Sequence, residues 1–145
     1  MSNVAKFLTA EEEQEIVQAI IEAEKNTSGE IRVHIEKHSG VEHYARAQEL
    51  FHILKMDNTK DENGVLIYVA VSDKKFVICG DKGIDKVVPI DFWATTKDAI
   101  QTHFKKGAFK TGIVEGILKA GQELEKHFPW QHNDTNELKN EVSKS

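Results

Sequence analysis

The sequence has little of what identifies a secreted or membrane protein. It contains one cysteine, Cys79, so no disulfide can form within the chain, which is typical of a reducing compartment. No apolar run approaches the ~20 residues needed to cross a bilayer. The first residues also lack the basic and apolar regions of a signal peptide. We therefore expect a soluble, cytoplasmic protein that does not insert directly into a membrane.

Positive charge is in the minority. The formal net charge is -5 over 145 residues, whereas proteins that bind nucleic acid need clustered Lys and Arg to contact phosphates. Nucleic acid is therefore excluded as the main partner, and we expect another protein in that role. The length suits one compact domain with its own hydrophobic core, which we expect to be a monomer.

Motifs for common cofactors and catalytic sites are missing as well. There is no P-loop, no complete GxGxxG, no HExxH and no pair of CxxC motifs. Cys79 lies in an apolar strand, where a thiol is usually buried and unreactive. The loop that begins at Asp57 resembles an EF-hand, but Glu62 stands where that loop requires glycine. No catalytic residue is identified from these patterns.

Apolar periodicity and turn residues predict alternating helices and strands. A capping box at Thr9 and Glu12 begins the first helix, and turn residues at 26–29 end it. Further helices are expected over about 41–55, between 91 and 107, and over about 111–127, with strands at 30–36, 65–71 and 74–80. Residues 1–130 form the predicted domain, and the polar residues 131–145 are predicted to be a flexible tail.

The three predicted strands should form one mixed sheet. A short turn joins the second strand to the third, which requires an antiparallel pair, whereas a helix joins the first to the second and favours a parallel pair. The strand at 65–71 is apolar on both sides and is expected to be central. In the strand at 30–36 polar and apolar residues alternate, so one side is expected to face water or polar neighbours.

Six oxygen-bearing side chains should meet at one end of this sheet. The first and second strands begin there and the third ends there. We call this set the acidic rim; it consists of Glu30, Asp61, Glu62, Asn63, Asp81 and Asp85. Crowded carboxylates repel one another, and ligands that are all oxygen favour Ca²⁺, with Mg²⁺ as the alternative. Acidic residues also gather in loops simply because loops are solvated. From the residues alone, both a cation site and an ordinary solvated group of acidic residues stay open.

Several segments together resemble the TPM domain, the family named for thylakoid lumen, photosystem repair and receptor-modulating proteins. The resemblance covers about Phe7 to Glu137 and rests on SGEIRVHI, ARAQELF, ENGVLIYVAVSDKKFVICGDKGI, FW and FKTGIVEGILKAGQELEKHFP. The chain is most similar to the stand-alone bacterial branch that ends in HFP and an NEL-containing tail. The resemblance implies a three-layer α/β/α sandwich, in which a small mixed β-sheet has helices on both faces.

The resemblance also implies a divalent-cation site, usually for calcium, at the acidic rim. The positions that match the family pattern are Glu30, Asn63, Gly64, Gly83 and Asp85. Asp61 and Glu62 lie in the variable acidic approach to the central strand. Many relatives have glycine-aromatic-glycine where this chain has Asp81, Lys82 and a glycine, so Asp81 would add a ligand and Lys82 a positive charge.

Three functions follow from these patterns. We favour a module for interaction or regulation that binds a divalent cation. The second is a metal-assisted acid phosphatase, an activity that the resemblance implies through some plant members; the third is a domain that binds a partner without metal. Other relatives act with membrane proteins, which implies a membrane-associated protein as the partner. Arg32 and Arg46 are the only arginines, which disfavours phosphoryl transfer because its transition state needs positive charge.

Overall fold

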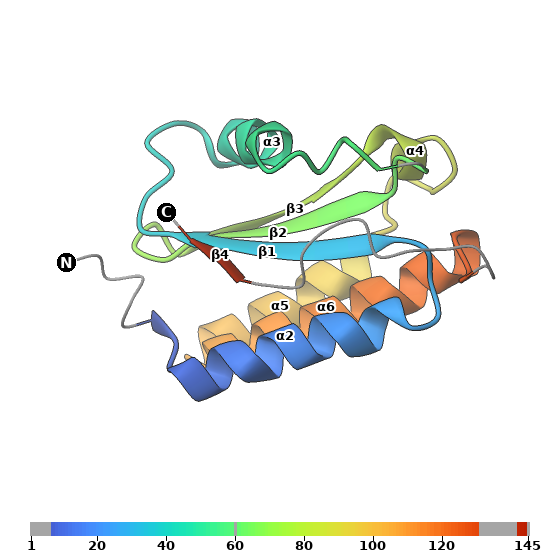
Figure 1. Ribbon diagram of the computed structural model, residues 1–145. Helices are drawn as coiled ribbons and strands as arrows, with labels where there is room; N and C mark the ends of the chain where they lie inside the picture. The colour runs from blue at the N-terminus through green and yellow to red at the C-terminus, as the bar shows by residue number, and fades with distance from the viewer. Residues whose placement is uncertain (1–6, 60, 131–141, 145) are drawn as a thin grey trace.

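The computed structural model describes residues 7–59, 61–130 and 142–144. In chain order the elements are α2 (Ala10–Glu24), β1 (Glu30–Glu36), α3 (His43–Ile53), β2 (Gly64–Ala70), β3 (Lys75–Gly80), α4 (Lys82–Asp85), α5 (Ala94–Lys105), α6 (Phe109–His127) and β4 (Val142–Lys144). Figure 1 shows a sheet with helices on both of its faces. This is the three-layer α/β/α sandwich that the sequence predicted.

The sheet is mixed, with the strand order β3-β2-β1-β4. β1 and β2 are parallel, in a register that begins with Glu30 opposite Gly64. β2 and β3 are antiparallel, and Val65 lies opposite Gly80. Both directions agree with those inferred from the connections, because a short turn and a helical crossover allow few other arrangements.

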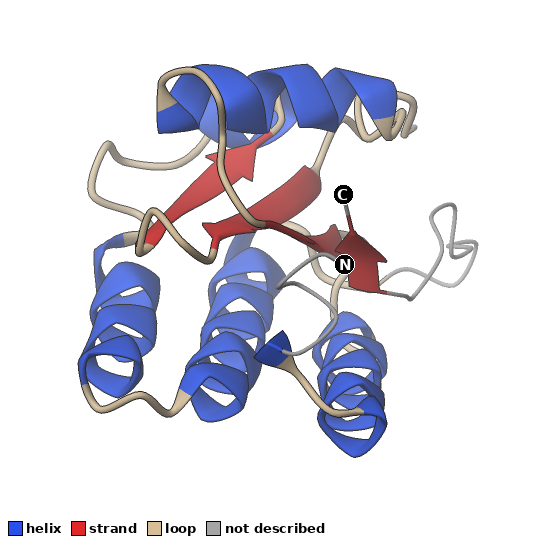
Figure 2. Ribbon diagram, turned by 90° about the vertical axis from the view of Figure 1, so that its left-hand side faces the viewer, coloured by secondary structure: helices blue, strands red, loops and turns tan. Residues whose placement is uncertain are grey.

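The helices are distributed unequally over the two faces. α2, α5 and α6 lie side by side on one face, and α3 covers the other (Figures 1 and 2). The larger core fills the space between the sheet and the three helices and includes Ile16, Ile20, Ile31, Ile67, Ile100, Ile113 and Ile117. A smaller core lies under α3 and includes Leu50, Phe51, Leu66, Tyr68 and Cys79. Each buried face of the sheet therefore has its own apolar layer.

Helix α6 lies against both of its neighbours because two of its glycines carry no side chain. A Cβ on Gly116 would lie 2.6 Å from the Ile100 side chain of α5, and a Cβ on Gly121 would lie 2.7 Å from the Cβ of Ala23 in α2. In the described part of the chain, no helix combines the length and the apolar character that crossing a bilayer requires.

One side of β1 faces polar neighbours, which is one of the two surroundings that the sequence allowed. All seven residues of the strand are buried, including the polar residues His34 and Glu36. Arg46 from α3 donates two hydrogen bonds of 2.9 Å to the Glu36 carboxylate, and the Tyr68 hydroxyl donates a third. The polar side chains of β1 therefore meet polar partners rather than water, because α3 and its arginine cover this face.

Two elements were not predicted. Val142–Lys144 form β4, which pairs in parallel with β1, whereas the sequence predicted a flexible tail for these residues; residues 131–141 of that tail lie outside the described part of the chain. The single helical turn α4 occupies Lys82–Asp85, in a segment predicted to be a loop. Neither segment is long enough to show a periodic pattern, and β4 depends on a partner strand that is distant in the sequence.

Candidate functional site

The three segments of the acidic rim meet at one end of the sheet. Gly64, at the start of β2, lies opposite Glu30, and the next residue, Val65, lies opposite Gly80 at the end of β3. The Asp81 N–H extends this pairing by donating to the Gly64 carbonyl oxygen at 2.9 Å. The strand directions therefore bring the segments together as the sequence predicted. The role of their side chains as metal ligands stays a prediction.

Helix α4 is held against the loop that precedes β2. The Asp81 Oδ1 atom accepts a hydrogen bond of 2.7 Å from the Lys82 N–H, which caps the helix. A Cβ on Gly83 would lie 2.4 Å from the Glu62 carbonyl oxygen and 2.5 Å from that of Asp61. Glu62 itself has a φ of 52°, in the left-handed region that few residues other than glycine adopt. Only glycine at position 83 permits this packing of α4 on the loop.

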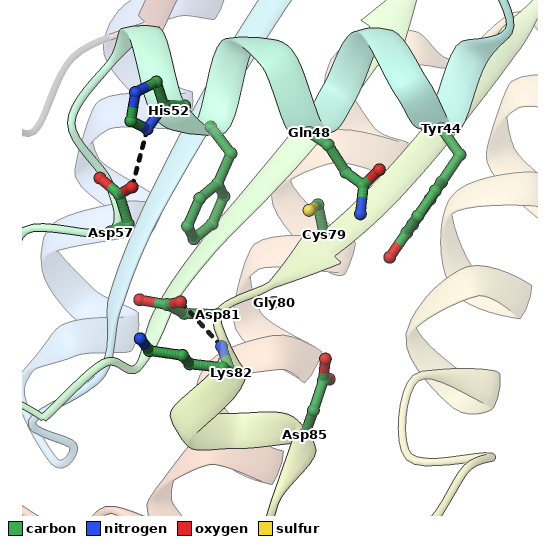
Figure 3. A pocket seen from close by; sticks show the side chains of 10 residues that line it. Tyr44, Gln48, His52, Asp57, Cys79, Gly80, Asp81, Lys82 and Asp85 are labelled. Atoms are coloured by element: carbon green, nitrogen blue, oxygen red, sulfur yellow. Dashed lines mark hydrogen bonds and ion pairs between the residues drawn. The ribbon is translucent and has the colours of Figure 1, made fainter.

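A pocket of about 360 Å³ lies between α3 and α4, and we call it the acidic pocket. Figure 3 shows α3 along one side of it and the end of β3, continuing into α4, along the other. Three carboxylates line it, from Asp57, Asp81 and Asp85. The remaining lining residues are Tyr44, Gln48, Phe51, His52, Cys79, Gly80 and Lys82. The volume is at the small end of the range for small-molecule sites.

Asp81 is the most constrained carboxylate of the acidic pocket. It is 7% exposed, and its Oδ2 atom is buried without a hydrogen-bond partner among the described residues. Burial raises the pKa of Asp81, and the negative charges of Glu62 and Asp57 raise it further. A positive charge placed beside Asp81 would therefore stabilise the folded protein.

Positive side chains balance this negative charge only in part. His52 Nδ1 lies 2.9 Å from Asp57 Oδ2, and that hydrogen bond holds the pKa of Asp57 below its ordinary value. Lys82 Nζ lies 3.4 Å from the Glu62 carboxylate; the lysine side chain is largely in water, and the glutamate side chain is 38% exposed. Among the described residues, the Asp85 carboxylate has no ion-pair partner. The pocket therefore keeps an excess of negative charge.

The groups that phosphoryl or thiol chemistry would need are not assembled in the acidic pocket. Burial raises the pKa of Cys79 to about 11, with contributions from Asp85 and Asp81, so the thiol stays protonated and a poor nucleophile at neutral pH. Arg46 is bound to Glu36 and does not line this pocket. The other arginine is a residue of β1 and does not line the pocket either.

Two residues of the acidic rim lie at the same end of the sheet but outside the acidic pocket. Asn63 is buried and donates a hydrogen bond of 3.1 Å from Nδ2 to Ser28 Oγ, which connects two loops. Glu30 is also buried, and its charge helps to raise the pKa of Glu24 on α2. The sequence predicted that both residues lie at this end of the sheet, but it did not predict the direction in which either side chain points.

Asp57 is a residue of the acidic pocket that the sequence analysis did not include. It follows α3 in the turn that leads back toward β2, and this turn places it across the pocket from α4 (Figure 3). The sequence did contain a signal for the position of Asp57. The helical crossover must return the chain to the beginning of β2, so the turn after α3 has to lie near that end of the sheet. The backbone carbonyl oxygens of Asp61 and Glu62 lie close to Gly83 of α4, but neither residue lines the pocket.

The arrangement does not form a closed metal cage. Within residues 7–59, 61–130 and 142–144, no three His, Cys, Asp or Glu side chains are grouped closely enough to enclose an ion. Ca²⁺ commonly completes its shell with carbonyl oxygens and water, so it does not need such a cage. Among the described residues, the Asp81 Oδ2 atom is the buried acceptor of this pocket that has no hydrogen-bond partner.

Comparison with known proteins agrees with the fold. The chain has 63% identity to the BA42 protein of the psychrophilic bacterium Bizionia argentinensis, whose NMR structure superposes with a TM-score of 0.93 over 100% of both chains. The N-terminal domain of a P. gingivalis protein has 18% identity and a TM-score of 0.70, covering 88% of this chain and 83% of that one.

A third NMR structure has the same fold at lower identity. The N-terminal domain of the cg2496 protein from Corynebacterium glutamicum has 11% identity and a TM-score of 0.67, covering 91% of this chain and 86% of that one. No match was found among curated proteins. The TPM domain matches residues 1–123, so the chain belongs to the TPM domain family.

Proposed function

We propose that the protein is an interaction module that binds a divalent cation, Ca²⁺, in the acidic pocket. The observation that carries this proposal is Asp81, whose Oδ2 atom is buried without a hydrogen-bond partner in a pocket shared with Asp57 and Asp85. A buried carboxylate in that state costs free energy unless a positive charge compensates it. A cation with two charges would stabilise Asp81 and reduce its repulsion with Asp57.

Asp81, Asp85 and Asp57 are the side chains that would hold the ion, with water in the remaining positions. Ca²⁺ tolerates an irregular shell of six to eight oxygens, whereas Mg²⁺ requires a near-ideal octahedron, so Ca²⁺ is the better fit and Mg²⁺ the alternative. An open site with three carboxylates favours a dissociation constant on the order of 10⁻⁴ to 10⁻³ M. The ion would then be bound only where calcium is abundant.

The surface beside the pocket supports the interaction part of the proposal. Val87 and Ile90, in the segment that follows α4, are 53% and 106% exposed, and Tyr44 on the pocket wall is 48% exposed. Exposed apolar side chains around a charged pocket are typical of a surface that binds another protein. A cation that holds α4 in place would order this segment for the partner.

Thermal unfolding with added CaCl₂ or MgCl₂, against NaCl at equal ionic strength, tests the proposal. At ten times the dissociation constant, an ion selective for the folded state raises Tm by about 5 °C. We expect that rise for the wild type and for Asp98→Asn, an exposed carboxylate on α5 that serves as the control. Asp85→Asn should lose most of it.

Amide NMR locates the ion. Calcium should shift the resonances of 80–85 and Asp57, whereas residues at the hairpin end of the sheet should not move. An unchanged Tm at millimolar calcium, or an equal rise in Asp85→Asn and the wild type, would refute the cation site. The same samples, assayed with p-nitrophenyl phosphate, test the phosphatase alternative, which requires turnover that Asp81→Asn abolishes.

A further inference from the structure

A second cavity lies at the opposite end of the sheet from the acidic pocket. Figure 1 shows the turn between β2 and β3 at one end of the sheet and α4 at the other. The cavity lies between that turn, the end of α5 and the start of α6, and its volume is about 620 Å³. We call it the phenylalanine cavity; its lining residues are Phe7, Val69, Ala70, Val71, Lys74, Lys75, Phe76, Gln101, Phe104, Lys105, Gly107 and Phe109.

Four phenylalanine rings form a continuous row along this cavity. The ring centroids of Phe7 and Phe109 are 4.8 Å apart, those of Phe109 and Phe104 are 5.3 Å apart, and those of Phe104 and Phe76 are 5.5 Å apart. None of the four is fully buried, and Phe109 is 38% exposed. The chain has seven phenylalanines, so most of them line one open cavity, where their apolar surface stays accessible to a ligand.

Three lysines surround the aromatic row. Lys74 comes from the turn between β2 and β3, Lys75 is the first residue of β3, and Lys105 comes from the last turn of α5. No acidic residue lines the cavity, and none of the three lysines has an ion-pair partner within the described residues. The nearby Asp73 is already bound by His38 and by His43. In a protein with a net charge of -5, this is a local concentration of unpaired positive charge.

We propose that the phenylalanine cavity binds a small amphipathic anion, namely a free single-chain fatty acid. Its alkyl chain would lie along the phenylalanine row and its carboxylate would lie among the three lysines. The volume is within the range of small-molecule sites. Burial of the alkyl chain against the phenylalanine rings would supply most of the binding free energy.

The lining also excludes other ligand classes. Among the described residues of the lining, Gln101 is the only polar side chain besides the lysines, so a nucleotide base or a sugar would leave its hydrogen-bonding groups unpaired. A bare phosphate would not use the aromatic row. A neutral or cationic amphiphile would gain nothing from the lysines, so the carboxylate should be required for tight binding.

An amide NMR titration with sodium decanoate, kept below its critical micelle concentration, tests the proposal. Decyl maltoside and decyltrimethylammonium serve as matched probes with the same chain and a neutral or cationic head group. We expect decanoate to shift resonances around the β2–β3 turn, the end of α5 and Phe109, with saturation at one site. The two matched probes should bind at least about tenfold more weakly.

Two variants separate the contributions of charge and of apolar surface. Replacing Lys74, Lys75 and Lys105 together by Gln should weaken decanoate binding about tenfold and remove its salt dependence. The matched control replaces three exposed lysines elsewhere, Lys86, Lys97 and Lys119, by Gln and should bind normally. Phe109→Ala should weaken decanoate and decyl maltoside by the same factor, because it removes apolar contact only.

Three outcomes would overturn the proposal. They are equal affinity for the three head groups, equal binding by the two triple-lysine variants, or shifts that fall outside the lining of the cavity. Vesicles that carry anionic lipids provide the last comparison, since a protein that binds the vesicles but not monomeric decanoate recognises a membrane surface instead. Because all six lysines are exposed, the lysine variants are expected to fold even if Phe109→Ala does not.

Discussion

Gly83 lies so close to the loop before β2 that a Cβ on it would meet the Glu62 carbonyl oxygen at 2.4 Å. This contact joins α4, which contains Asp85, to the loop before β2, which contains Asp61 and Glu62. Neither backbone can yield easily, because Glu62 already has a left-handed φ of 52° and Asp81 caps the helix. The position of the acidic pocket therefore depends on one missing side chain.

Gly83→Ala should push α4 away from the loop. We expect the free energy of unfolding to fall by about 1–3 kcal/mol, as for other overpacked sites, and the affinity for calcium to fall with it. Urea unfolding followed by circular dichroism measures the first effect. Gly80→Ala is the matched control, because its nearest contact would be an ordinary 3.5 Å to Ile84. Equal losses in the two variants would contradict the packing argument.

Asp81→Asn should separate stability from cation binding. The amide oxygen can still cap Lys82, while the buried negative charge disappears. Since burial raises the pKa of Asp81, the wild type loses stability as the pH rises from the unfolded value of about 3.8 through the folded value. Without calcium at pH 7, the variant should therefore be more stable than the wild type by about 1 kcal/mol.

Calcium should then stabilise the wild type but not Asp81→Asn. Thermal melts at pH 7, with calcium or with a chelator, compare the two directly. A variant that is less stable in the chelator and still responds to calcium would show that Asp81 is neither strained nor a ligand.

Arg46→Met should leave the buried Glu36 carboxylate without its cationic partner. Burial alone would raise the pKa of Glu36, but hydrogen bonds from Arg46 and Tyr68 hold it below its ordinary value. We expect a loss of about 3 kcal/mol in the free energy of unfolding, because one member of a buried ion pair remains uncompensated. Glu49→Gln removes the exposed partner of Arg46 and should cost less than about 1 kcal/mol.

The double variant Glu36→Gln with Arg46→Met completes this test. It should recover part of the stability lost in Arg46→Met, because no charge is left buried. Chemical denaturation at pH 7 of the wild type, Glu36→Gln, Arg46→Met and the double variant gives the coupling energy between Glu36 and Arg46. A double variant as unstable as the sum of the two single changes would argue against a buried ion pair.

Glu24→Gln should change how stability depends on pH. Burial raises the pKa of Glu24 to about 7, and the charge of Glu30 adds to the shift, while the Ile31 N–H donates to its carboxylate at 2.8 Å. The folded state then binds more protons than the unfolded state, so stability falls as the pH rises from about 4.5 through about 7. At pH 8 the variant should be more stable than the wild type by about 1–3 kcal/mol.

At pH 4 the Glu24→Gln variant and the wild type should be nearly equal, since both carry a neutral group there. Urea denaturation across that pH range is the measurement, with Glu22→Gln, on an exposed position of the same helix, as the control. A stability difference that does not change with pH would rule out the titration of Glu24 as its cause.

His34→Gln should act in the opposite direction. Burial lowers the pKa of His34 to about 4, so the folded state binds fewer protons than the unfolded state. The wild type therefore loses stability as the pH falls from about 6.5 to about 4. The variant should lose less stability than the wild type over that interval, as thermal melts at pH 7 and pH 4.5 would reveal. A steeper loss in the variant would mean that His34 is protonated in the fold.

The sequence predicted the elements best where local patterns decide them. β1 begins and ends at the residues given by the EIRVHIE alternation, and α2 begins at the predicted capping box between Thr9 and Glu12. The crossover and the short turn then determined the strand directions, and with them the meeting of Glu30, Gly64 and Gly80 at one end. These are consequences of chain connectivity, so they need no knowledge of side-chain packing.

The candidate site was predicted less completely, because side-chain direction is a packing property. Asn63 was predicted as a metal ligand, which stays a prediction, and no pattern in the sequence indicated that its Nδ2 donates to Ser28 Oγ. Asp57 was not expected, yet it lines the acidic pocket with Asp81. The strand β4 has three residues and no pattern of its own, and it exists only because β1 offers an open edge.

The sequence by itself determined the mixed sheet and the end of that sheet at which acidic segments gather, because hydrophobic period, turn length and crossover length are local properties of the chain; the family followed from the resemblance of whole segments. Only the tertiary structure decided which carboxylates share a pocket, that Asp81 is buried without a partner, and that four phenylalanines and three lysines surround one cavity. Those relationships depend on how helices and turns distant in sequence pack against the sheet, and no single segment encodes that packing.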